Sequence, residues 1–386
     1  MKTIGIMLPA LRMGGAEVIA LNYIKKLCND FDITIIVNKI DGELLNEVPS
    51  NVSVSEDRLF SFKEIIKKDV KHLSLLKCIK DINYYLRVKL KRNNEKDNLY
   101  LISRTKINPN RFDVLICFVA NVSTQIFRAT TGFKASKKIA WIHGETNELK
   151  DNKLFEQQYS CFDQIVCVSN ITKDHFLLKY PKQKDKTIVL YNPIDKETII
   201  EKSKEECDIV FDKNTFNIVS VGRLSPEKGF TMIPEILKII RETKPELKIN
   251  WYLIGDGPTR TFIEEGIKKY KILNLFLLGF KRNPYSYMAQ ADLYVQPSYE
   301  EGYSTTICEA GILGKTILAT DCSGGIKEQI CDGINGYLCS AISNDIAKRI
   351  IWIYEEQFIS KCLQSKAYQM DFSNSKSVDI VKQLLS

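Results

Sequence analysis

Short apolar runs alternate along this chain with longer stretches in which apolar residues recur at helical spacing. Strands alternating with helices in this way are typical of βαβ units, so the pattern predicts a parallel sheet covered by helices. In the first half, the expected strands are Ile4–Leu8, Ile33–Val37, Val114–Phe118, Lys138–Ile142 and Gln164–Val168.

The same alternation restarts in the second half of the chain. Tyr191–Asp195 joins turn-forming residues to a proline, which indicates an interdomain hinge. We therefore expect two doubly wound α/β domains at residues 1–193 and 194–370, with a C-terminal helix in 371–386 that packs back on the first domain. The second set of strands is Phe216–Val221, Ile249–Ile254, Leu275–Leu278, Leu293–Val295 and Thr316–Ala319.

Charge changes this picture in one region. The net charge is +8, and residues 61–111 contain fourteen lysines and arginines against five acidic residues, so the rest of the chain is nearly neutral. Apolar residues at helical spacing between the lysines predict basic amphipathic helices. Two interpretations remain open: a solvated helix pair, or a surface for anionic lipid head groups or a lipid-linked acceptor. Nucleic acid is less favoured, because no recognition motif accompanies the charge.

Composition also indicates where in the cell the protein is expected. No stretch approaches the ~20 apolar residues that cross a bilayer, and the first strand is too short for a signal peptide. The eleven cysteines show no CxxC pairs, which is typical of reduced thiols. We expect a cytoplasmic protein, with any membrane association peripheral and at the inner face of the plasma membrane.

Candidate chemistry begins in the loop after the first strand of the second domain. There the sequence GRLSPEKG places Arg223 and Lys228 on a tight turn that we expect to open a helix. An arginine fork, a lysine point charge and helix amides together suit a diphosphate. An ordinary surface loop is the alternative for this turn taken alone.

A second segment, EGYSTTICEA, carries two carboxylates eight positions apart. Glu301 is expected in a loop and Glu309 about a turn into a helix. Carboxylates accept paired hydrogen bonds from vicinal hydroxyls, so one suits a sugar and the other a ribose. A pair that merely interacts with the helix dipole is the alternative.

Together with further motifs, these residues resemble family 4 of the glycosyltransferases, the retaining GT-B group, and in particular its bacterial capsule and O-antigen members. The resemblance spans most of the chain and is weakest from about 57 to 110. Ser304 stands where the family often has glycine, and Pro193 where its hinge often has glycine. The further motifs are Ile254–Pro258, Leu278–Phe280, Ala291–Asp292, Gly324–Glu328, Asp332–Gly336, Gly14–Glu17 and Trp141–Gly144.

The resemblance implies a role for each matching residue. Arg223 and Lys228 would hold the donor diphosphate, Glu309 the nucleotide ribose and Glu301 the transferred sugar. His143 would lie at the cleft near the donor sugar and the acceptor, with a catalytic role shared with Glu301, Arg223 and Lys228. The other implied donor-binding residues are Gly15, Gly279, Phe280, Lys281, Gly302, Tyr303, Ser304, Thr305 and Thr306.

The implied activity is transfer of a sugar from a nucleotide sugar, expected to be UDP-linked, to a hydroxyl of a glycan acceptor, expected to be linked to a polyprenyl diphosphate. We expect neither a metal nor a cofactor. A dehydrogenase is disfavoured because the loop Pro9–Gly15 lacks GxGxxG. A GT-B nucleotide-sugar epimerase and a non-catalytic GT-B partner protein remain as alternatives.

Overall fold

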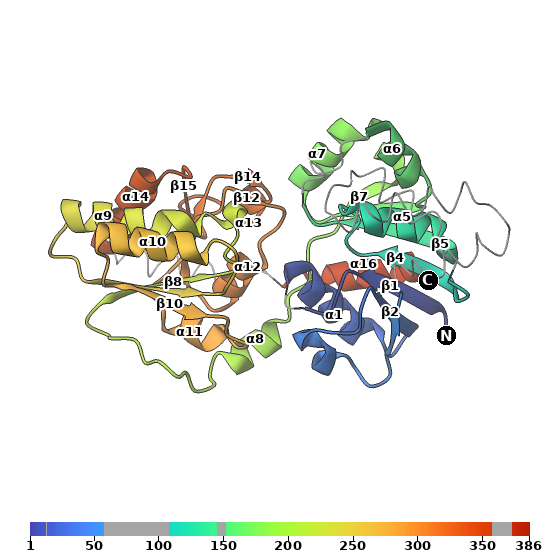
Figure 1. Cartoon of the computed structure of the whole chain (residues 1–386), viewed down its shortest axis with the longest axis horizontal. Coiled ribbons are helices and arrows are strands. Elements are labelled where there is room, and N and C mark those ends of the chain that lie inside the picture. Colours follow the sequence, from blue (N-terminus) through green and yellow to red (C-terminus); the bar gives the residue numbers. More distant parts are fainter. Residues whose placement is uncertain (13, 58–107, 145–151, 357–372) are drawn as a thin grey trace, which may run out of the picture. The chain divides into compact units, whose positions relative to one another are not determined.

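The computed structural model describes the whole chain except residues 13, 58–107, 145–151 and 357–372. It contains two compact units (Figure 1). The first comprises Met1–Tyr191 with Lys376–Ser386, and the second is Asn192–Ser375. The divisions lie beside the expected boundaries after 193 and 370. Most of the basic segment 61–111 lies outside the described residues.

The first unit is built on a seven-stranded parallel sheet in the order β3-β2-β1-β4-β5-β6-β7. The chain winds outward from β1 to β3 and then returns to β4 on the other side of β1, so the sheet is doubly wound as predicted. The short edge strands β3 and β7 were not anticipated. The strands are β1 Thr3–Leu8, β2 Asp32–Val37, β3 Ser53–Glu56, β4 Arg111–Cys117, β5 Lys134–Ile142, β6 Gln164–Cys167 and β7 Thr187–Val189.

Helices cover both faces of this sheet, with α5, α6 and α7 on one side and α1 on the other (Figure 1). On the α1 side, Tyr23 and Phe118 pack their rings against fully buried Trp141. The C-terminal helix α16 returns to this unit, where Lys382 pairs with Asp30 at 2.6 Å. The helices are α1 Gly15–Leu27, α5 Ser123–Thr131, α6 Asn152–Ser160, α7 Asn170–Lys179 and α16 Lys376–Leu385, with 3-10 turns η1 Glu43–Glu47 and η2 Pro181–Lys186.

The second unit has a six-stranded parallel sheet in the order β10-β9-β8-β11-β13-β15 and a small ladder of β12 with β14. Predicted strand positions agree to within one residue at each end, whereas β12, β14 and β15 were not foreseen. The strands are β8 Phe216–Val221, β9 Ile249–Ile254, β10 Leu275–Gly279, β11 Leu293–Gln296, β12 Glu300–Glu301, β13 Thr316–Thr320, β14 Ser323–Gly324 and β15 Tyr337–Cys339.

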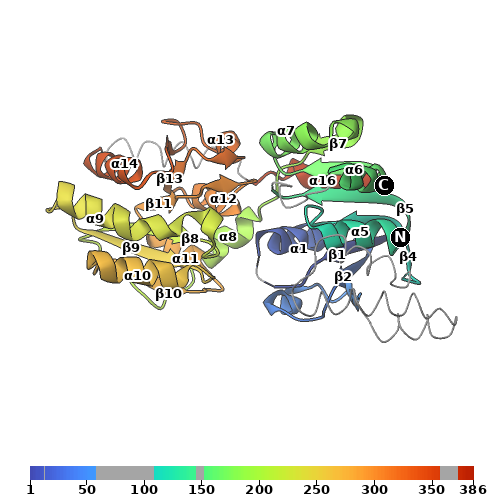
Figure 2. The ribbon, with the colours of Figure 1, turned by 45° about the horizontal axis from the view of Figure 1, so that its top comes forward.

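Two apolar cores lie on opposite faces of this second sheet. One contains side chains of α9 and α14, and the other contains side chains of α11 and α12. Figure 2 shows the same layers from a second direction. The helices are α8 Lys196–Lys202, α9 Ile233–Thr243, α10 Arg260–Tyr270, α11 Tyr285–Gln290, α12 Thr305–Ile312, α13 Ile326–Gln329 and α14 Ser343–Glu355, with 3-10 turns η3 Pro226–Lys228 and η4 Phe230–Met232.

Two glycines allow the segments that follow β8, β11 and β13 to pack closely. Gly229 has φ +67°, and a Cβ there would lie 1.9 Å from the carbonyl oxygen of Pro297. Gly324 has φ +126°, and its Cβ would lie 1.6 Å from the carbonyl oxygen of Glu301. Left-handed backbone and the missing side chain make glycine the residue that fits at both positions.

Candidate functional site

The candidate site lies at the carboxyl ends of β8 and β11, which are neighbouring parallel strands. Loops that follow neighbouring parallel strands emerge at the same edge of the sheet. A backbone hydrogen bond of 2.8 Å from the Tyr299 N–H to the Glu227 carbonyl joins the two loops. The GRLSPEKG turn and the EGYSTTICEA segment therefore meet in space.

The closest contact between these loops is an ion pair. Lys228 Nζ donates to Glu301 Oε1 over 2.6 Å, and only 7% of the Glu301 side chain is exposed. Gln296 Nε2 and Ser298 Oγ donate to the same oxygen, each at 3.0 Å. Burial and three donors on Oε1 fix the carboxylate in one orientation. Glu301 was expected in a loop, but it lies in the short strand β12 because β14 pairs with it.

Gln296 and Ser298 were missed by the sequence reasoning. Gln296 is the last residue of β11, and Ser298 lies two positions later. Because side chains two positions apart on an extended chain point to the same side, both face Glu301. Gln296 is further held by Tyr294, whose hydroxyl donates to Gln296 Oε1 at 2.6 Å. The available signal was a polar QPS sequence directly after an apolar strand.

The Arg223 side chain pairs with Glu227 and not with Lys228 or Glu301. Its side chain is 72% exposed, and it contacts Glu227 at 3.4 Å. Burial raises the pKa of Glu227, but hydrogen bonds from Ser225 and Arg223 outweigh that effect and lower it overall. One expectation for this turn is wrong: α9 begins only at Ile233, after two 3-10 turns, because left-handed Gly229 interrupts the helical path. The amides of a long helix therefore do not support Lys228.

Helix α12 begins at Thr305, as expected, and places Glu309 about one turn from its start. Glu309 is 8% exposed, and the Tyr285 hydroxyl donates to its Oε1 at 3.4 Å. Burial raises the pKa of this carboxyl to about 7, with the Tyr285 bond opposing the rise. A buried carboxylate with one long hydrogen bond retains capacity to accept bonds from a ligand.

The loop that leads into α12 is fixed by Gln329, which the sequence reasoning did not select. The Ser304 N–H donates to Gln329 Oε1 at 2.9 Å, and Gln329 Nε2 donates to the Ser304 carbonyl at 2.7 Å. In the same loop, the Gly302 carbonyl accepts from the Gly325 N–H at 3.1 Å. The loop is thus held at both ends while Thr305 and Thr306 begin the helix.

The segment expected near a nucleotide base follows β10. Gly279 has φ +68°, and no heavy atom lies within 4 Å of a Cβ placed on it, so the backbone there borders open space. Phe280 is 50% exposed, which leaves a ring face available for stacking. Lys281 is instead tied to Asp208 at 2.5 Å, and the Tyr287 hydroxyl also donates to Asp208.

Two expected residues lie in the first unit. Gly15 begins α1, and a Cβ there would meet no atom within 4 Å. His143 follows β5, and its ring lies 4.9 Å from the Phe118 ring. Burial lowers the pKa of His143 to about 4, against the effect of a hydrogen bond with the Phe118 backbone. The imidazole is therefore neutral near pH 7.

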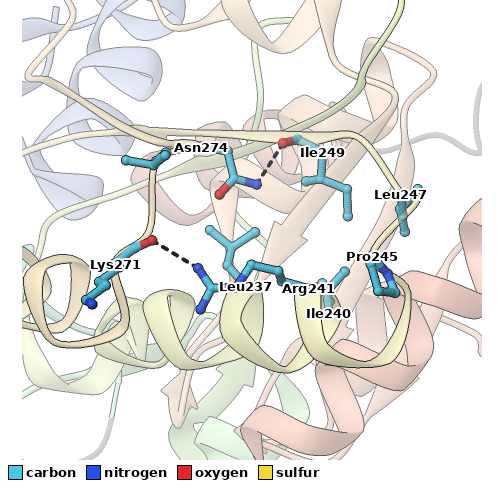
Figure 3. A pocket seen from close by; sticks show the side chains of 9 residues that line it. Leu237, Ile240, Arg241, Pro245, Leu247, Ile249, Lys271 and Asn274 are labelled. Carbon is cyan, nitrogen blue, oxygen red and sulfur yellow. Dashed lines mark hydrogen bonds between the residues drawn. The ribbon is translucent and has the colours of Figure 1, made fainter.

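A hollow of about 170 Å³ lies away from all these residues, between α9 and the amino ends of β9 and β10 (Figure 3). Figure 3 shows that Arg241 spans it and donates to the Lys271 carbonyl, at 3.0 Å. It shares no residue with the loops at the carboxyl ends of the strands. Within the described ranges, no three His, Cys, Asp or Glu side chains are grouped closely enough for a metal, and no helix is both long and apolar enough to span a membrane.

Comparisons with known proteins show which family the chain resembles. Residues 201–370 match the sequence model of the family described as "Glycosyl transferases group 1". The chain is 25% identical, over 99% of its own length and 97% of the relative's, to the N-acetylgalactosamine-N,N'-diacetylbacillosaminyl-diphospho-undecaprenol 4-alpha-N-acetylgalactosaminyltransferase of Campylobacter jejuni. It is 23% identical, over 80% of its length and 76% of the relative's, to the O-antigen biosynthesis glycosyltransferase WclY of Escherichia coli.

Among solved structures, Anabaena HepE in complex with UDP and glucose superposes with a TM-score of 0.69 at 18% identity, covering 100% of this chain and 99% of that one. The two parallel-sheet units thus have the GT-B fold. Residues 201–370, which include Lys228, Glu301 and Glu309, match the glycosyl transferases group 1 family, and the resemblance seen in the sequence is confirmed.

Proposed function

We propose that this protein is a retaining hexosyltransferase that moves a sugar from a UDP-sugar to a hydroxyl of a glycan acceptor, without a metal or cofactor. The observation that carries the proposal is the pair of Lys228 with buried Glu301, four residues before the start of α12. It places a cation, an oriented carboxylate and helix amides around one point. The relative crystallised with UDP and glucose supports the choice of donor.

The donor's diphosphate would bind at Lys228, with Arg223 closing over it. Lys228 is already oriented by Glu301, whereas Arg223 is exposed and is held only by a 3.4 Å contact with Glu227. Amides of Thr305 and Thr306, at the start of α12, supply further donors. These positive groups would stabilise the charge that builds on the departing UDP, at about 2–4 kcal/mol for each donor.

The two carboxylates would bind different parts of the donor. All three protein donors meet Glu301 at Oε1, so its other oxygen is the one that would accept from hydroxyls of the transferred sugar. Glu309 would accept from the ribose diol, together with Tyr285. A base in the same complex would stack on Phe280, next to open space at Gly279.

The proposed reaction is front-face transfer, in which the departing diphosphate oxygen assists deprotonation of the incoming hydroxyl. A double displacement requires two carboxyls ~5 Å apart about the anomeric carbon, one of them a nucleophile. In the second unit, Glu301 is held by Lys228, Gln296 and Ser298, which suits it to binding rather than nucleophilic attack. His143, neutral near pH 7, would orient hydroxyls instead of acting as an acid.

The proposed acceptor is a glycan on a polyprenyl diphosphate, presented at the inner face of the plasma membrane during surface polysaccharide synthesis. The Campylobacter jejuni relative's name describes a diphospho-undecaprenol acceptor. The basic segment 61–111, which lies largely outside the described residues, provides the charge for peripheral contact with anionic lipid.

A donor screen tests the proposal. Thermal shift and hydrolysis are measured over UDP-, GDP-, ADP- and dTDP-sugars, because donor binding requires no knowledge of the acceptor. We expect stabilisation and slow hydrolysis with UDP-sugars, and loss of both in Lys228→Met. The control Lys238→Met alters a lysine on the exposed side of α9 that pairs with Glu242 at 3.8 Å, and should behave as the parent. Conversion of a UDP-sugar to its epimer, or no binding of any nucleotide, would overturn the proposal.

A further inference from the structure

Hydrogen-bonded side chains connect Glu301 to the start of α12 through Gln296. Gln296 is the last residue of β11 and is 1% exposed. Its amide nitrogen donates to Glu301 Oε1 at 3.0 Å and to Ser298 Oγ at 2.7 Å. Its amide oxygen accepts from the Tyr294 hydroxyl at 2.6 Å and from Thr306 Oγ1 at 3.2 Å. Both donors and both lone pairs of this buried amide are therefore used.

The direction of these hydrogen bonds is fixed from the Glu301 end. A carboxylate that pairs with Lys228 accepts hydrogen bonds and donates none, so the Gln296 atom that faces it is the amide nitrogen. The amide oxygen then faces Tyr294 and Thr306, which both donate. Burial raises the pKa of the Tyr294 hydroxyl well above its ordinary value, which keeps that proton in place. The Gln296 amide therefore fits in one orientation only.

Gln296 connects two groups that would hold different parts of the donor. Glu301 would bind the transferred sugar, and Thr306 lies at the start of α12, whose amides would bind the diphosphate. The start of α12 has a second attachment, because Gln329 bonds both the N–H and the carbonyl of Ser304. Gln296 thus links the sugar carboxylate to a helix start that is also held in place without it.

We propose that Gln296 is a positioning residue for the transfer reaction, which sets the place of the Glu301 carboxylate relative to the start of α12 and must be uncharged to do so. This proposal rests on the proposed function and adds a residue to its site. Loss of the amide should slow the reaction of the sugar and leave binding of UDP, which lacks the transferred sugar, nearly unchanged. A carboxyl at position 296 would replace an atom 3.0 Å from Glu301 Oε1, and two carboxyls so close share one proton.

Gln296→Met, which keeps the length of the side chain and removes the amide, tests whether the amide is needed. UDP affinity is measured by isothermal titration, and UDP-sugar hydrolysis is measured at saturating donor. We expect hydrolysis to slow at least about tenfold while the dissociation constant for UDP stays within about twofold of the parent's, because Gln329 still holds the start of α12. Hydrolysis at the parent rate, or an equal loss of UDP affinity, would overturn the positioning role.

Gln296→Glu tests the need for an uncharged residue through its pH profile. At pH 6 the shared proton takes the place of the amide hydrogen that faces Glu301, whereas at pH 8 both carboxyls are ionised and repel each other. The rate of this variant relative to the parent should therefore rise at least about tenfold from pH 8 to pH 6, while the ratio for Gln296→Met stays flat. A flat ratio for Gln296→Glu would contradict the proposal.

Other ionisable groups around Glu301 are the same in the variant and the parent. Lys228 of η3 pairs with Glu301, and Glu309 of α12 has its pKa raised by burial to about 7. Burial raises the pKa of the Cys308 and Cys322 thiols to about 12, so both stay neutral. Their effects on the rate cancel in the ratio of variant to parent.

A matched change separates positioning from folding. Ser220 lies in β8, beside β11, and is fully buried; its Oγ accepts from Trp251 Nε1 at 3.1 Å and donates to the Val295 carbonyl at 2.6 Å. Ser220→Ala should lower the melting temperature and keep the parent's rate, UDP affinity and pH profile. The same kinetic losses in Ser220→Ala would reduce Gln296 to a structural residue.

A melting measurement without substrate keeps the test independent of the donor. The melting temperature of Gln296→Glu relative to the parent should fall from pH 6 to pH 8, because the folded state holds the shared proton more tightly than the unfolded chain does. A constant difference would show that residue 296 does not face Glu301. A parent that hydrolyses no UDP-sugar would instead refute the proposed function, and with it the role of Gln296.

Discussion

Lys228 and Glu301, 73 residues apart in sequence, share a 2.6 Å hydrogen bond between Nζ and Oε1 at the carboxyl edge of the second sheet. Each group orients the other: the cation neutralises a buried carboxylate, and the carboxylate holds the lysine side chain in place. They should therefore act as one functional unit.

A double-mutant cycle measures this coupling. Lys228→Met and Glu301→Gln should each lower the rate of UDP-sugar hydrolysis about 10²-fold, because each removes a charge that acts on the donor. The double variant should be little worse than either single one, since neighbours that act together are not additive. Arg223→Met alters an exposed side chain outside the pair. Its fold-reduction of the hydrolysis rate should therefore multiply with that of Lys228→Met. Additive effects of Lys228 and Glu301 would contradict the coupling.

Substitutions of the two carboxylates, Glu301 and Glu309, should have different kinetic effects. Glu301→Ala is expected to lower mainly turnover, because it would contact the sugar that reacts. Glu309→Ala is expected to weaken mainly nucleotide binding, because it would contact the ribose. Isothermal titration with UDP, alongside turnover of UDP-sugar, distinguishes them. If Glu309→Ala binds UDP as tightly as the parent, the ribose assignment is wrong.

Donor affinity should depend on pH through Glu309. Burial raises the pKa of Glu309 to about 7, so this carboxyl favours the proton in the folded protein below neutrality and is mostly ionised above it. The ionised form accepts from the ribose diol, so affinity for UDP-glucose should fall about tenfold from pH 8 to pH 6. UDP-glucose is the suitable probe because its diphosphate has no titrating group in this range. Glu309→Gln should flatten the profile, and an unchanged slope in that variant would assign the titration elsewhere.

The same pKa predicts a stability trend. The folded state binds this proton more tightly than the unfolded chain does. The contribution of Glu309 to the free energy of unfolding should therefore decline from about pH 4.5 to pH 7 and then level off. Urea denaturation of the parent and of Glu309→Gln, compared over this range, isolates the contribution.

Chelation should leave the enzyme active, since Lys228, Arg223 and the α12 amides would carry the charge that a divalent ion carries in other transferases. UDP-sugar binding and hydrolysis are measured before and after EDTA, with a manganese-dependent transferase as the positive control. Loss of activity on chelation that is restored by manganese or magnesium would end the metal-free proposal.

The basic segment 61–111 should bind anionic membranes. Four or five well-placed cations at about 1 kcal/mol each suffice for reversible attachment. Co-sedimentation with anionic liposomes should be strong at low salt, weak at high salt and absent with neutral lipid. A variant with Lys67, Lys68, Lys71 and Lys77 changed to Glu should stay in the supernatant. Unchanged sedimentation of that variant would leave the segment as a structural elaboration of the first unit.

Much of the architecture could be predicted from the sequence. Strands such as Phe216–Val221 and Ile249–Ile254 are mostly apolar runs bounded by polar loops, which is typical of buried parallel strands, so their positions could be predicted from local pattern. The short strand β12 has no such pattern. It forms because Gly324 lacks a side chain and lets β14 approach the Glu301 backbone, a contact between segments that sequence spacing does not reveal.

The sequence by itself determined the two doubly wound units and the residue types that the donor site requires. Only the tertiary structure decided how those residues are used. Glu301 is oriented by Gln296 and Ser298, Lys228 is paired while Arg223 is exposed, and Glu309 is buried enough to titrate near neutrality. The physical reason is that local pattern fixes strands and helices, whereas hydrogen-bond partners and burial depend on which distant loops the sheet order brings to one edge.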